Sequence, residues 1–533
     1  MVDTTGSRRW LAVGALALSC LAIGIDGTVL SLALPTLSVD LHASTSQLQW
    51  FVDAYLLVLG AMMIPAGLLG DRIGRKRVLV FALALFAIGS LACAYSTTSG
   101  QLIMARAVLG LAAAFILPLA LGVLPVIFAE HERQRAIAIV ASSAIVAYPL
   151  GPILGGWLLT HYWWGSVFLI NVPVIALAIL AVAFLLPESR SAQRPGLDPI
   201  GIVLSIAGLS TLTYGVIEAG QHGWGDHRAI SGMVAGAIVL VGFVLWESAA
   251  ARRGSQPLVD LKLFATAGFS WGTILATLVS FAMMGVLFSV PQYLRAALGF
   301  NAMGAGVRLL PMIGGMFVGL GIGDRMSRWV GSKHTSALGF AITAGGFGVA
   351  AFTTVHNGTG YIALWIAVVG FGVGFALPST MNAAMAQLSK ERAGVGSALL
   401  TAVRQVGGTF GVAILGSALN SGYHSRLDLA GLPPKAVATI KDNVASGIAV
   451  ADKLGSPGLR SSIIAAFVHG SDVMAVVSGG VAVAGFVIAL LFLPRRVASA
   501  DGVEEVPRGT TPPTPPTEPR SVAAPKHVAR PRA

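Results

Sequence analysis

The 533-residue chain is too apolar for a soluble protein. Hydrophobic residues make up 55% of it and charged residues 11%, and its mean hydropathy is +0.78. A soluble domain carries about a quarter charged residues, so this composition excludes a water-exposed globular surface. The net charge of +12 raises the question of nucleic acid. The basic residues, however, lie in short loops between apolar runs and in the C-terminal tail, so no nucleic-acid partner is expected.

Apolar runs close to the roughly 20 residues needed to cross a bilayer recur along the chain. Each run must be helical, because lipid offers the backbone no hydrogen-bond partner. The fold class is therefore an all-α integral membrane protein. Cys20 and Cys93 lie within the runs and are expected to pack as small apolar residues. Fourteen spans are predicted, at 11–34, 48–70, 78–95, 102–126, 136–159, 167–186, 200–218, 229–247, 268–290, 304–323, 335–353, 361–385, 395–418 and 472–493.

The charges of the short loops predict the orientation. Twenty Lys and Arg residues fall in one set of short loops, whereas the opposite set holds only Arg228, Arg295 and Arg308. Basic loops stay in the cytoplasm, so both termini are expected there, which requires an even number of spans. Arginine greatly outnumbers lysine and Ala and Gly are plentiful, which favours a GC-rich bacterial source. The expected location is the inner or plasma membrane.

The chain divides into five predicted parts. A short cytoplasmic N-terminus (1–10) precedes an N-terminal six-helix bundle (11–186), an inserted helix pair with its flanking loops (187–267) and a C-terminal six-helix bundle (268–493). The C-terminal bundle contains a long extracytoplasmic loop (419–470), rich in Gly, Pro and mixed charge. Residues 494–533 are rich in Pro, Thr and Arg and are predicted to be a disordered cytoplasmic tail.

An internal sequence repeat supports the division into two bundles. The sequence GLLGDRIGRKR (67–77) follows the second span, and GIGDRMSRWVGSK (321–333) follows the tenth. Both place Gly-Asp-Arg at the cytoplasmic end of a span, before a basic turn. Repeated halves are typical of secondary transporters. If the first and last six spans form the halves, the seventh and eighth are an insertion.

These motifs resemble the major facilitator superfamily, and specifically its fourteen-span drug:proton antiporter branch (EmrB/QacA type), from about residue 10 to 493. The stretch from Gly67 to Lys76 is similar to the signature loop of the superfamily. Ala147 and Gly165 depart from the residues usual at their positions in the branch. Other stretches resemble motifs of the branch, namely 26–35, 50–55, 102–110, 151–156, 168–173 and 404–408. The resemblance implies two bundles that rock to expose a central site alternately to each side.

Few ionisable residues fall within the predicted spans, where each costs about 2.5–3.5 kcal/mol. Asp26, Asp53 and Arg106 all lie in the outer half of the first bundle. The hypothesis is that Asp26 alternately binds a proton and a cationic substrate, that Arg106 tunes its proton release, and that Asp53 is a second acidic site. The alternative is that either carboxylate simply hydrogen-bonds a neighbouring helix.

The signature loop contributes Gly67, Asp71, Arg72, Gly74 and Arg75 at the cytoplasmic edge. Asp71 is expected to accept backbone donors from a neighbouring helix start and to pair with an arginine. Such a latch would hold one access state and break in the other. The alternative is that these basic residues only fix topology.

Two further groups lie in later spans. Gly151, Pro152, Gly155 and Gly156 form the antiporter motif, whose small residues permit close helix approach and form either a leak-resistant seam or ordinary packing. Arg404 and Gln405 either line the cavity or form structural hydrogen bonds.

The sequence contains no phosphate-binding Gly-x-x-x-x-Gly-Lys loop and no metal or nucleophile motif, so no cofactor, metal site or enzyme activity is expected. An ion gradient is the remaining energy source. The predicted function is proton-coupled multidrug efflux of amphipathic or cationic compounds, with small molecules, protons and the lipid bilayer as partners and a monomeric protein. The alternatives are export of an endogenous metabolite or self-made antibiotic and, in another class, a non-transporting membrane sensor or assembly factor.

Overall fold

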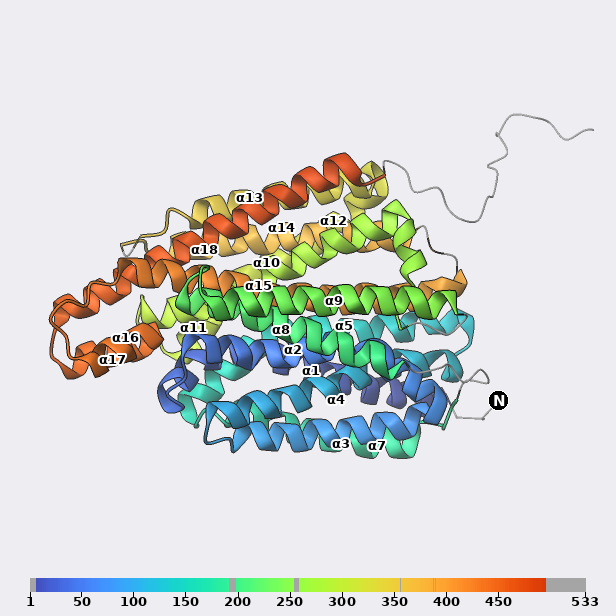
Figure 1. The fold of residues 1–533 in the computed structure, drawn as a ribbon. Helices are drawn as coiled ribbons and strands as arrows, with labels where there is room; N and C mark the ends of the chain where they lie inside the picture. The colour runs from blue at the N-terminus through green and yellow to red at the C-terminus, as the bar shows by residue number, and fades with distance from the viewer. Residues whose placement is uncertain are drawn as a thin grey trace, which may run out of the picture.

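The computed structural model describes residues 6–190, 198–253, 258–354, 356–386, 388 and 390–494, which form helices joined by turns (Figure 1). In this part of the chain, 13 helical segments are long and apolar enough to cross a membrane. The expected span at 335–353 is helix α13 (Ser332–Ala350), whose first turn is polar. The predicted all-α membrane fold is therefore confirmed. The tail expected from residue 494 lies outside the described residues, apart from Pro494 itself.

The first six spans pack around one apolar core, to which Leu16, Phe51, Phe86 and Leu109 contribute. In this bundle the first span packs on the fifth, and the second on the fourth. The sixth span is broken near Ile170, where the short first helix ends. The elements are α1 (Gly6–Asp40), α2 (Thr45–Ile73), α3 (Arg75–Ala94), α4 (Ser99–Ile127), α5 (Glu130–His161), α6 (Ser166–Leu169) and α7 (Asn171–Leu185).

The last six spans form a second bundle with its own core, which includes Phe340, Phe347, Ile366 and Phe467. Glycines on the second of these spans lie directly against the backbone of the fourth, because small residues allow helices to approach closely in lipid. The elements are α10 (Ala267–Ala296), α11 (Ala302–Arg308), α12 (Leu310–Val330), α13, α14 (Thr359–Met385), α15 (Lys390–Arg426) and α18 (Pro457–Phe492).

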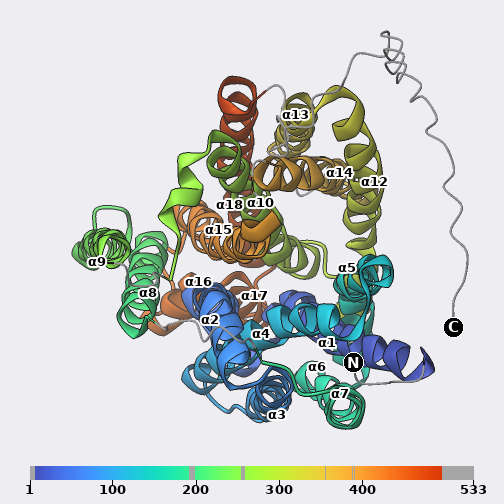
Figure 2. The ribbon, with the colours of Figure 1, turned by 90° about the vertical axis from the view of Figure 1, so that its right-hand side faces the viewer.

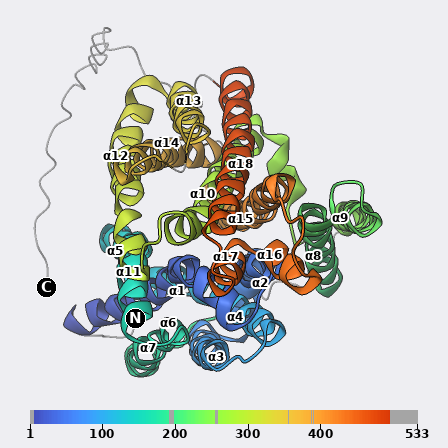
Figure 3. The same cartoon turned by 90° about the vertical axis from the view of Figure 1, so that its left-hand side faces the viewer.

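The inserted pair comprises α8 (Pro199–His222) and α9 (His227–Arg252), followed by the short helix η1 (Leu261–Ala265). The two long helices pack on each other, and α8 also packs on α2 of the first bundle and α15 of the second. They stand to one side of both bundles when the molecule is viewed from either end (Figures 2 and 3). Asn420 on α15 anchors the pair, because its Nδ2 donates to the carbonyl of Gly220 at 3.0 Å.

The segment 419–470 was expected to be a loop, and the structure corrects this. Helix α15 continues to Arg426, α18 already begins at Pro457, and between them lie α16 (Pro434–Asp442) and α17 (Val444–Lys453). Ile440, Val444 and Ala451 are buried against the adjoining ends of α15 and α18. Glycine, proline and mixed charge suggested a loop, but apolar residues at helical spacing give the short helices a buried face.

The two ends of the molecule are distinguished by their neighbours. The first residues of α1 and the last residues of α18 lie at one end, here named the terminal end, whereas α16 and α17 form the opposite hairpin end (Figure 1). At the hairpin end the bundles are joined by Asn443 Nδ2, which donates to the Ala43 carbonyl at 2.7 Å, and by Thr45 Oγ1, which donates to the Asp442 carbonyl at 2.9 Å. The two bundles are thus in contact at the hairpin end.

Candidate functional site

A buried ion pair joins α1 to α4 in the first bundle. The guanidinium of Arg106 lies 2.6 Å from Asp26 Oδ2, and their side chains are 1% and 0% exposed. Arg106 Nε donates to the Phe51 carbonyl at 2.9 Å, and its guanidinium lies 4.3 Å from the centre of the Tyr55 ring. Asn171 Nδ2 on α7 donates to Asp26 Oδ1 at 3.2 Å. Residues of four helices thus form one buried network, in which the opposite charges of Asp26 and Arg106 cancel.

Asp53 is also buried but does not belong to this network. Neither of its carboxylate oxygens has a hydrogen-bond partner, although both are shielded from solvent. Gln49, Asp53 and Gly60 share one face of α2 by helical spacing. Gln49 Nε2 donates to the Ala413 carbonyl of α15 at 3.0 Å, and a Cβ on Gly60 would lie 3.3 Å from the Ala402 carbonyl. Asp53 therefore lies on the face of α2 that meets the other bundle.

The signature loop forms a local network at the terminal end. Arg75 Nε lies 2.7 Å from Asp71 Oδ1, and Arg75 Nη1 donates to the Gly122 carbonyl of α4 at 2.5 Å. The predicted pairing of Asp71 with an arginine is observed, and it joins the end of α2 to the start of α3. The contact of Asp71 in the described part of the chain is with the Arg75 side chain, whereas backbone donors of another helix were expected. Arg72 is exposed. Gly74 forms the turn between α2 and α3, and its φ is +134°, a backbone conformation that residues with a side chain rarely adopt.

Glu188, which was not predicted as a site residue, holds this loop in place. It follows the sixth span, and its Oε1 accepts from the Lys76 backbone N–H at 3.2 Å, while Oε2 lies 3.5 Å from Arg77 Nε. A Cβ on Gly74 would lie 2.6 Å from Glu188 Oε1. The available signal was a carboxylate directly after the sixth span, on the same side as the basic signature loop.

A cavity of about 500 Å³ opens at the terminal end between the bundles. Gly67, Asp71 and Arg75 line it from the first bundle, together with residues of α4 and Ile137 of α5, and Ser397, Ala398 and Thr401 line it from α15. The signature loop thus borders the space between the bundles rather than closing it.

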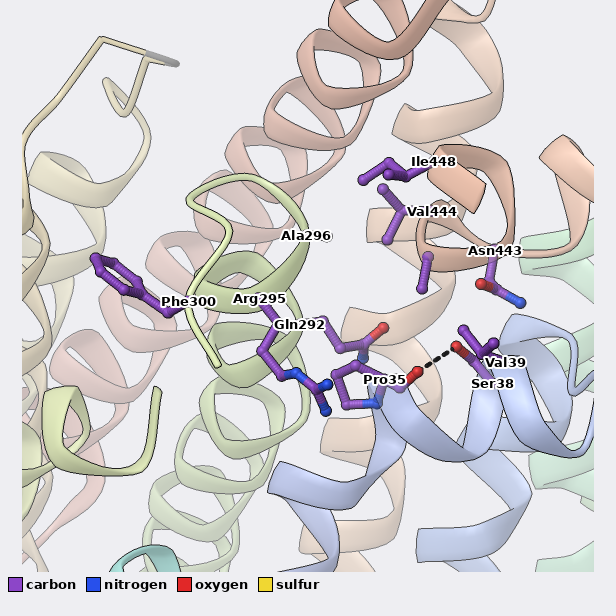
Figure 4. A pocket seen from close by; sticks show the side chains of 11 residues that line it. Pro35, Ser38, Val39, Gln292, Arg295, Ala296, Phe300, Asn443, Val444 and Ile448 are labelled. Atoms are coloured by element: carbon purple, nitrogen blue, oxygen red, sulfur yellow. Dashed lines mark hydrogen bonds between the residues drawn. The ribbon is translucent and has the colours of Figure 1, made fainter. Parts of the chain in front are cut away.

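A smaller cavity, of about 190 Å³, lies at the hairpin end between α1, α10 and α17. Figure 4 shows Arg295 of α10 beside Pro35 of α1, with Val444 and Ile448 of α17 above them. Arg295 Nη1 donates to Thr36 Oγ1 at 2.5 Å and so links the two bundles. The hairpin end is held by polar contacts around this small cavity, in contrast to the larger space at the terminal end.

The antiporter motif packs α5 against both bundles. Gly151 and Gly155 face Thr28 and Val29 of α1, where an added Cβ would clash. A Cβ on Gly156 would lie 2.9 Å from Met303 Cα, and Pro152 contacts Gly306, so α5 also meets α11 of the other bundle. The structure therefore contains close packing within the first bundle and a seam between the bundles.

Replacing Gly156 with alanine is expected to open this seam. Overpacking costs about 1–3 kcal/mol, which should shift the population away from the hairpin-closed state by about 5–150-fold. Maleimide labelling of a cysteine introduced at Ser38, in the cavity at the hairpin end, should then increase. Gly345→Ala is the matched control, since no atom lies within 4 Å of its Cβ position. Equal labelling in the two variants would contradict the seam.

Arg404 and Gln405 of α15 point in different directions. The Gln405 Cβ lies 3.3 Å from the Cβ position of Gly60, so this residue packs against α2. Arg404 Nη1 contacts Met381 Sδ of α14 at 3.9 Å. No ion pair to Arg404 occurs within the part of the chain that the structure describes. Among the described residues, neither Arg404 nor Gln405 belongs to the lining of the cavity of about 500 Å³ at the terminal end.

Two helical bundles that enclose a cavity and carry buried charges define the class of protein, a polytopic membrane transporter. The chain belongs to the major facilitator superfamily, whose family model matches residues 16–412. Members of this family are transporters and not enzymes. The resemblance found in the motifs is thereby confirmed at the level of the superfamily.

Named relatives support membership of this family, and a solved structure shares the fold. The tetracenomycin C resistance and export protein of Streptomyces glaucescens is 32% identical over 91% of this chain and 91% of its own. The multidrug efflux pump LfrA of Mycolicibacterium smegmatis is 33% identical, over 84% and 89%. An inward-facing, unoccupied bacterial homologue of the human lysosomal transporter Spinster has a TM-score of 0.67 at 18% identity, covering 93% of this chain and 100% of that chain. This structural likeness shows the fold alone.

Proposed function

We propose that this chain is a proton-driven exporter of amphipathic, drug-like compounds, of the fourteen-span antiporter branch. The observation that carries the proposal is Asp53, buried without a partner on the face of α2 that meets the second bundle. A charged carboxylate there would lose its hydration without gaining a donor, so Asp53 holds a proton in the state described. Substrate that enters from the terminal end displaces this proton, and Asp53 takes up another proton from the opposite side after the bundles have moved.

The buried pair of Asp26 and Arg106 has a different role in this proposal. Arg106 lies 2.6 Å from the carboxylate of Asp26, so the two opposite charges compensate each other and the pair fixes α1 against α4 in the present state. The sequence alone does not decide whether Asp26 or Asp53 leads in proton binding. We assign that part to Asp53, and we propose that Asp26 binds a proton or a cationic group only when its contact with Arg106 breaks.

The alternating cycle follows from where the bundles touch. With the termini in the cytoplasm, as the basic loops predict, the cavity at the terminal end faces the cytoplasm and admits substrate. The seam at α5 and α11 and the contacts of α16 and α17 would then part to release substrate outside. In that outward-open state the signature loop, including Asp71 and Arg75, would act as a latch at the inner end.

A second candidate, export of a self-made antibiotic, is favoured by particular relatives. Besides the tetracenomycin exporter, the chain is 34% identical to a cephamycin export protein of Amycolatopsis lactamdurans. A methyl viologen resistance protein of Salmonella typhimurium, at 31% identity, favours cationic toxins instead. Transport of ethidium, methyl viologen and tetracenomycin C by one purified preparation separates the two candidates. Nothing favours a non-transporting sensor or assembly factor.

Purified protein in liposomes should accumulate substrate when a proton gradient is imposed without ATP. One proton moving through 100 mV provides about 2.3 kcal/mol, or roughly fifty-fold accumulation. Ethidium fluorescence inside the vesicles measures this ratio, and addition of a proton uncoupler should return it to one. Accumulation that survives the uncoupler would contradict proton coupling, and absence of any transport of the three compounds would contradict the substrate class.

A further inference from the structure

Two carboxyl groups meet at the terminal end of the inserted helix pair. Asp198 directly precedes α8, and Glu247 lies near the end of α9. A Cβ on Gly201 would lie 2.7 Å from Asp198 Oδ2 and 2.5 Å from Glu247 Oε1, so these two oxygens approach each other beside a residue that has no side chain. Because successive spans reverse direction, the seventh span begins and the eighth ends at the terminal end, where α1 begins.

Every oxygen of the two carboxyl groups except one accepts a hydrogen bond. Asp198 Oδ1 accepts from the Gly201 backbone N–H at 2.9 Å, and Oδ2 accepts from Trp246 Nε1 at 2.8 Å. Glu247 Oε2 accepts from the Val259 backbone N–H at 3.0 Å. Glu247 is 0% exposed, and its Oε1 has no hydrogen-bond partner. Buried polar atoms are nearly always hydrogen-bonded, so this oxygen indicates a missing hydrogen or a missing ligand.

No basic side chain in the described part of the chain forms an ion pair with either carboxyl group. Asp260 accepts from the Lys262 backbone N–H, and α15 meets α8 near its other end, at Ser417 and Asn420. The remaining charged side chains of adjoining elements at this end are exposed or already paired, namely Arg72 and the Asp71–Arg75 pair at α2, Arg252 and Arg253 of α9, and Lys262 of η1.

One proton satisfies both the missing hydrogen bond and the missing charge compensation. If Glu247 carries the proton on Oε1, it donates to Asp198 Oδ2, and all four oxygens then take part in hydrogen bonds. Two carboxyl groups in one site commonly share a proton, because both cannot be ionised at such a short distance. A metal ion needs more ligands than this, and the described residues contain no group of three or more acidic, His or Cys side chains that could hold one.

We propose that Asp198 and Glu247 bind one proton between them and so form a clasp that closes the terminal end of the inserted pair. The clasp joins α8 to α9 and, through the Val259 backbone, to the segment that leads into η1 and α10. The proton belongs to the closed state, so rising pH removes it, places two negative charges in a buried contact and opens the clasp. The site is separate from Asp53 and does not rest on the proposed transport.

Hydrogen exchange of the Val259 amide in the full-length protein, measured in lipid nanodiscs by mass spectrometry with residue-level fragmentation, tests the clasp. After correction for the intrinsic effect of pH, the wild-type rate should rise by up to about tenfold per pH unit, because opening releases one proton. Glu247→Gln replaces the proton with a fixed amide donor, so its corrected rate should not depend on pH. Asp324→Asn removes an exposed carboxylate of α12 and should behave as the wild type does.

A flat wild-type profile, or an equal slope in Glu247→Gln, would overturn the proposal. Exchange that responds to sodium or calcium ions at constant pH would assign the site to a metal ion and would overturn it too. Infrared spectra report the proton directly. At neutral pH a carboxylic-acid carbonyl component should be present in the wild type and lost in Glu247→Gln, and unchanged spectra in that variant would contradict a bound proton.

A steric change tests the contact without removing a titratable group. Gly201→Ala places a Cβ between the two carboxyl groups and should accelerate exchange of the Val259 amide at every pH. Gly242→Ala on α9 is the matched control, since no atom lies within 4 Å of its Cβ position. Equal exchange in the two alanine variants would show that the contact of Asp198 with Glu247 does not hold this segment.

Discussion

Replacing Asp53 with asparagine is expected to remove proton-driven accumulation while leaving the protein folded. Asparagine has nearly the shape of a protonated carboxyl group, so the unpartnered site on α2 keeps its packing but can no longer gain or lose a proton. The accumulation ratio in liposomes should fall by about fifty-fold at 100 mV, the factor that one proton provides. Substrate exchange without a gradient should continue.

A matched neutralisation at Glu218 provides the control for Asp53→Asn. Glu218 lies on α8 and pairs with His222 one turn away, at 3.0 Å. Glu218→Gln should therefore leave accumulation unchanged. If Asp53→Asn accumulates substrate as the wild type does, the carboxyl group of Asp53 takes no part in coupling.

Removal of one member of the Asp26–Arg106 pair is expected to destabilise the protein severely. Each side chain is almost fully buried, so Asp26→Asn leaves an uncompensated guanidinium and Arg106→Met leaves an uncompensated carboxylate. Breaking a buried pair in this way costs about 3–5 kcal/mol. Both single variants should show lower abundance in the membrane and a lower midpoint of thermal unfolding in detergent.

The double variant, Asp26→Asn with Arg106→Met, should recover much of this stability because no buried charge remains. The cost of the two changes together should be well below the sum of the separate costs, which identifies direct coupling. Strictly additive losses would show that the two residues act independently. Full transport by a stable double variant would restrict the pair to a structural role.

The helical architecture could be predicted from sequence because each span is a long apolar run with a basic loop at one end. The direction in which each side chain points around its helix could not be predicted from the sequence. Asp53 and Arg106 were placed at a similar depth, yet Arg106 bonds the Phe51 carbonyl on one side of α2 while Gln49 and Gly60 contact α15 on the other. In α2 the apolar residues surround the whole helix, so their pattern does not show which face meets which neighbour.

The early start of α18 and the hairpin helices were missed for a related reason. The last span was predicted to begin at residue 472, where continuous apolarity begins, but α18 starts at Pro457 and extends well beyond that point. Asp472 therefore looked like the edge of a span rather than a residue within a long helix.

Proton release on substrate binding tests the central claim, that Asp53 is protonated when the site is empty, most directly. Purified transporter in a weakly buffered solution with a pH-sensitive dye is mixed with ethidium or tetracenomycin C, whichever it binds. The wild type should release protons as substrate binds. Asp53→Asn should bind the same compound and release one proton fewer per transporter molecule. Undiminished release from Asp53→Asn would contradict the account.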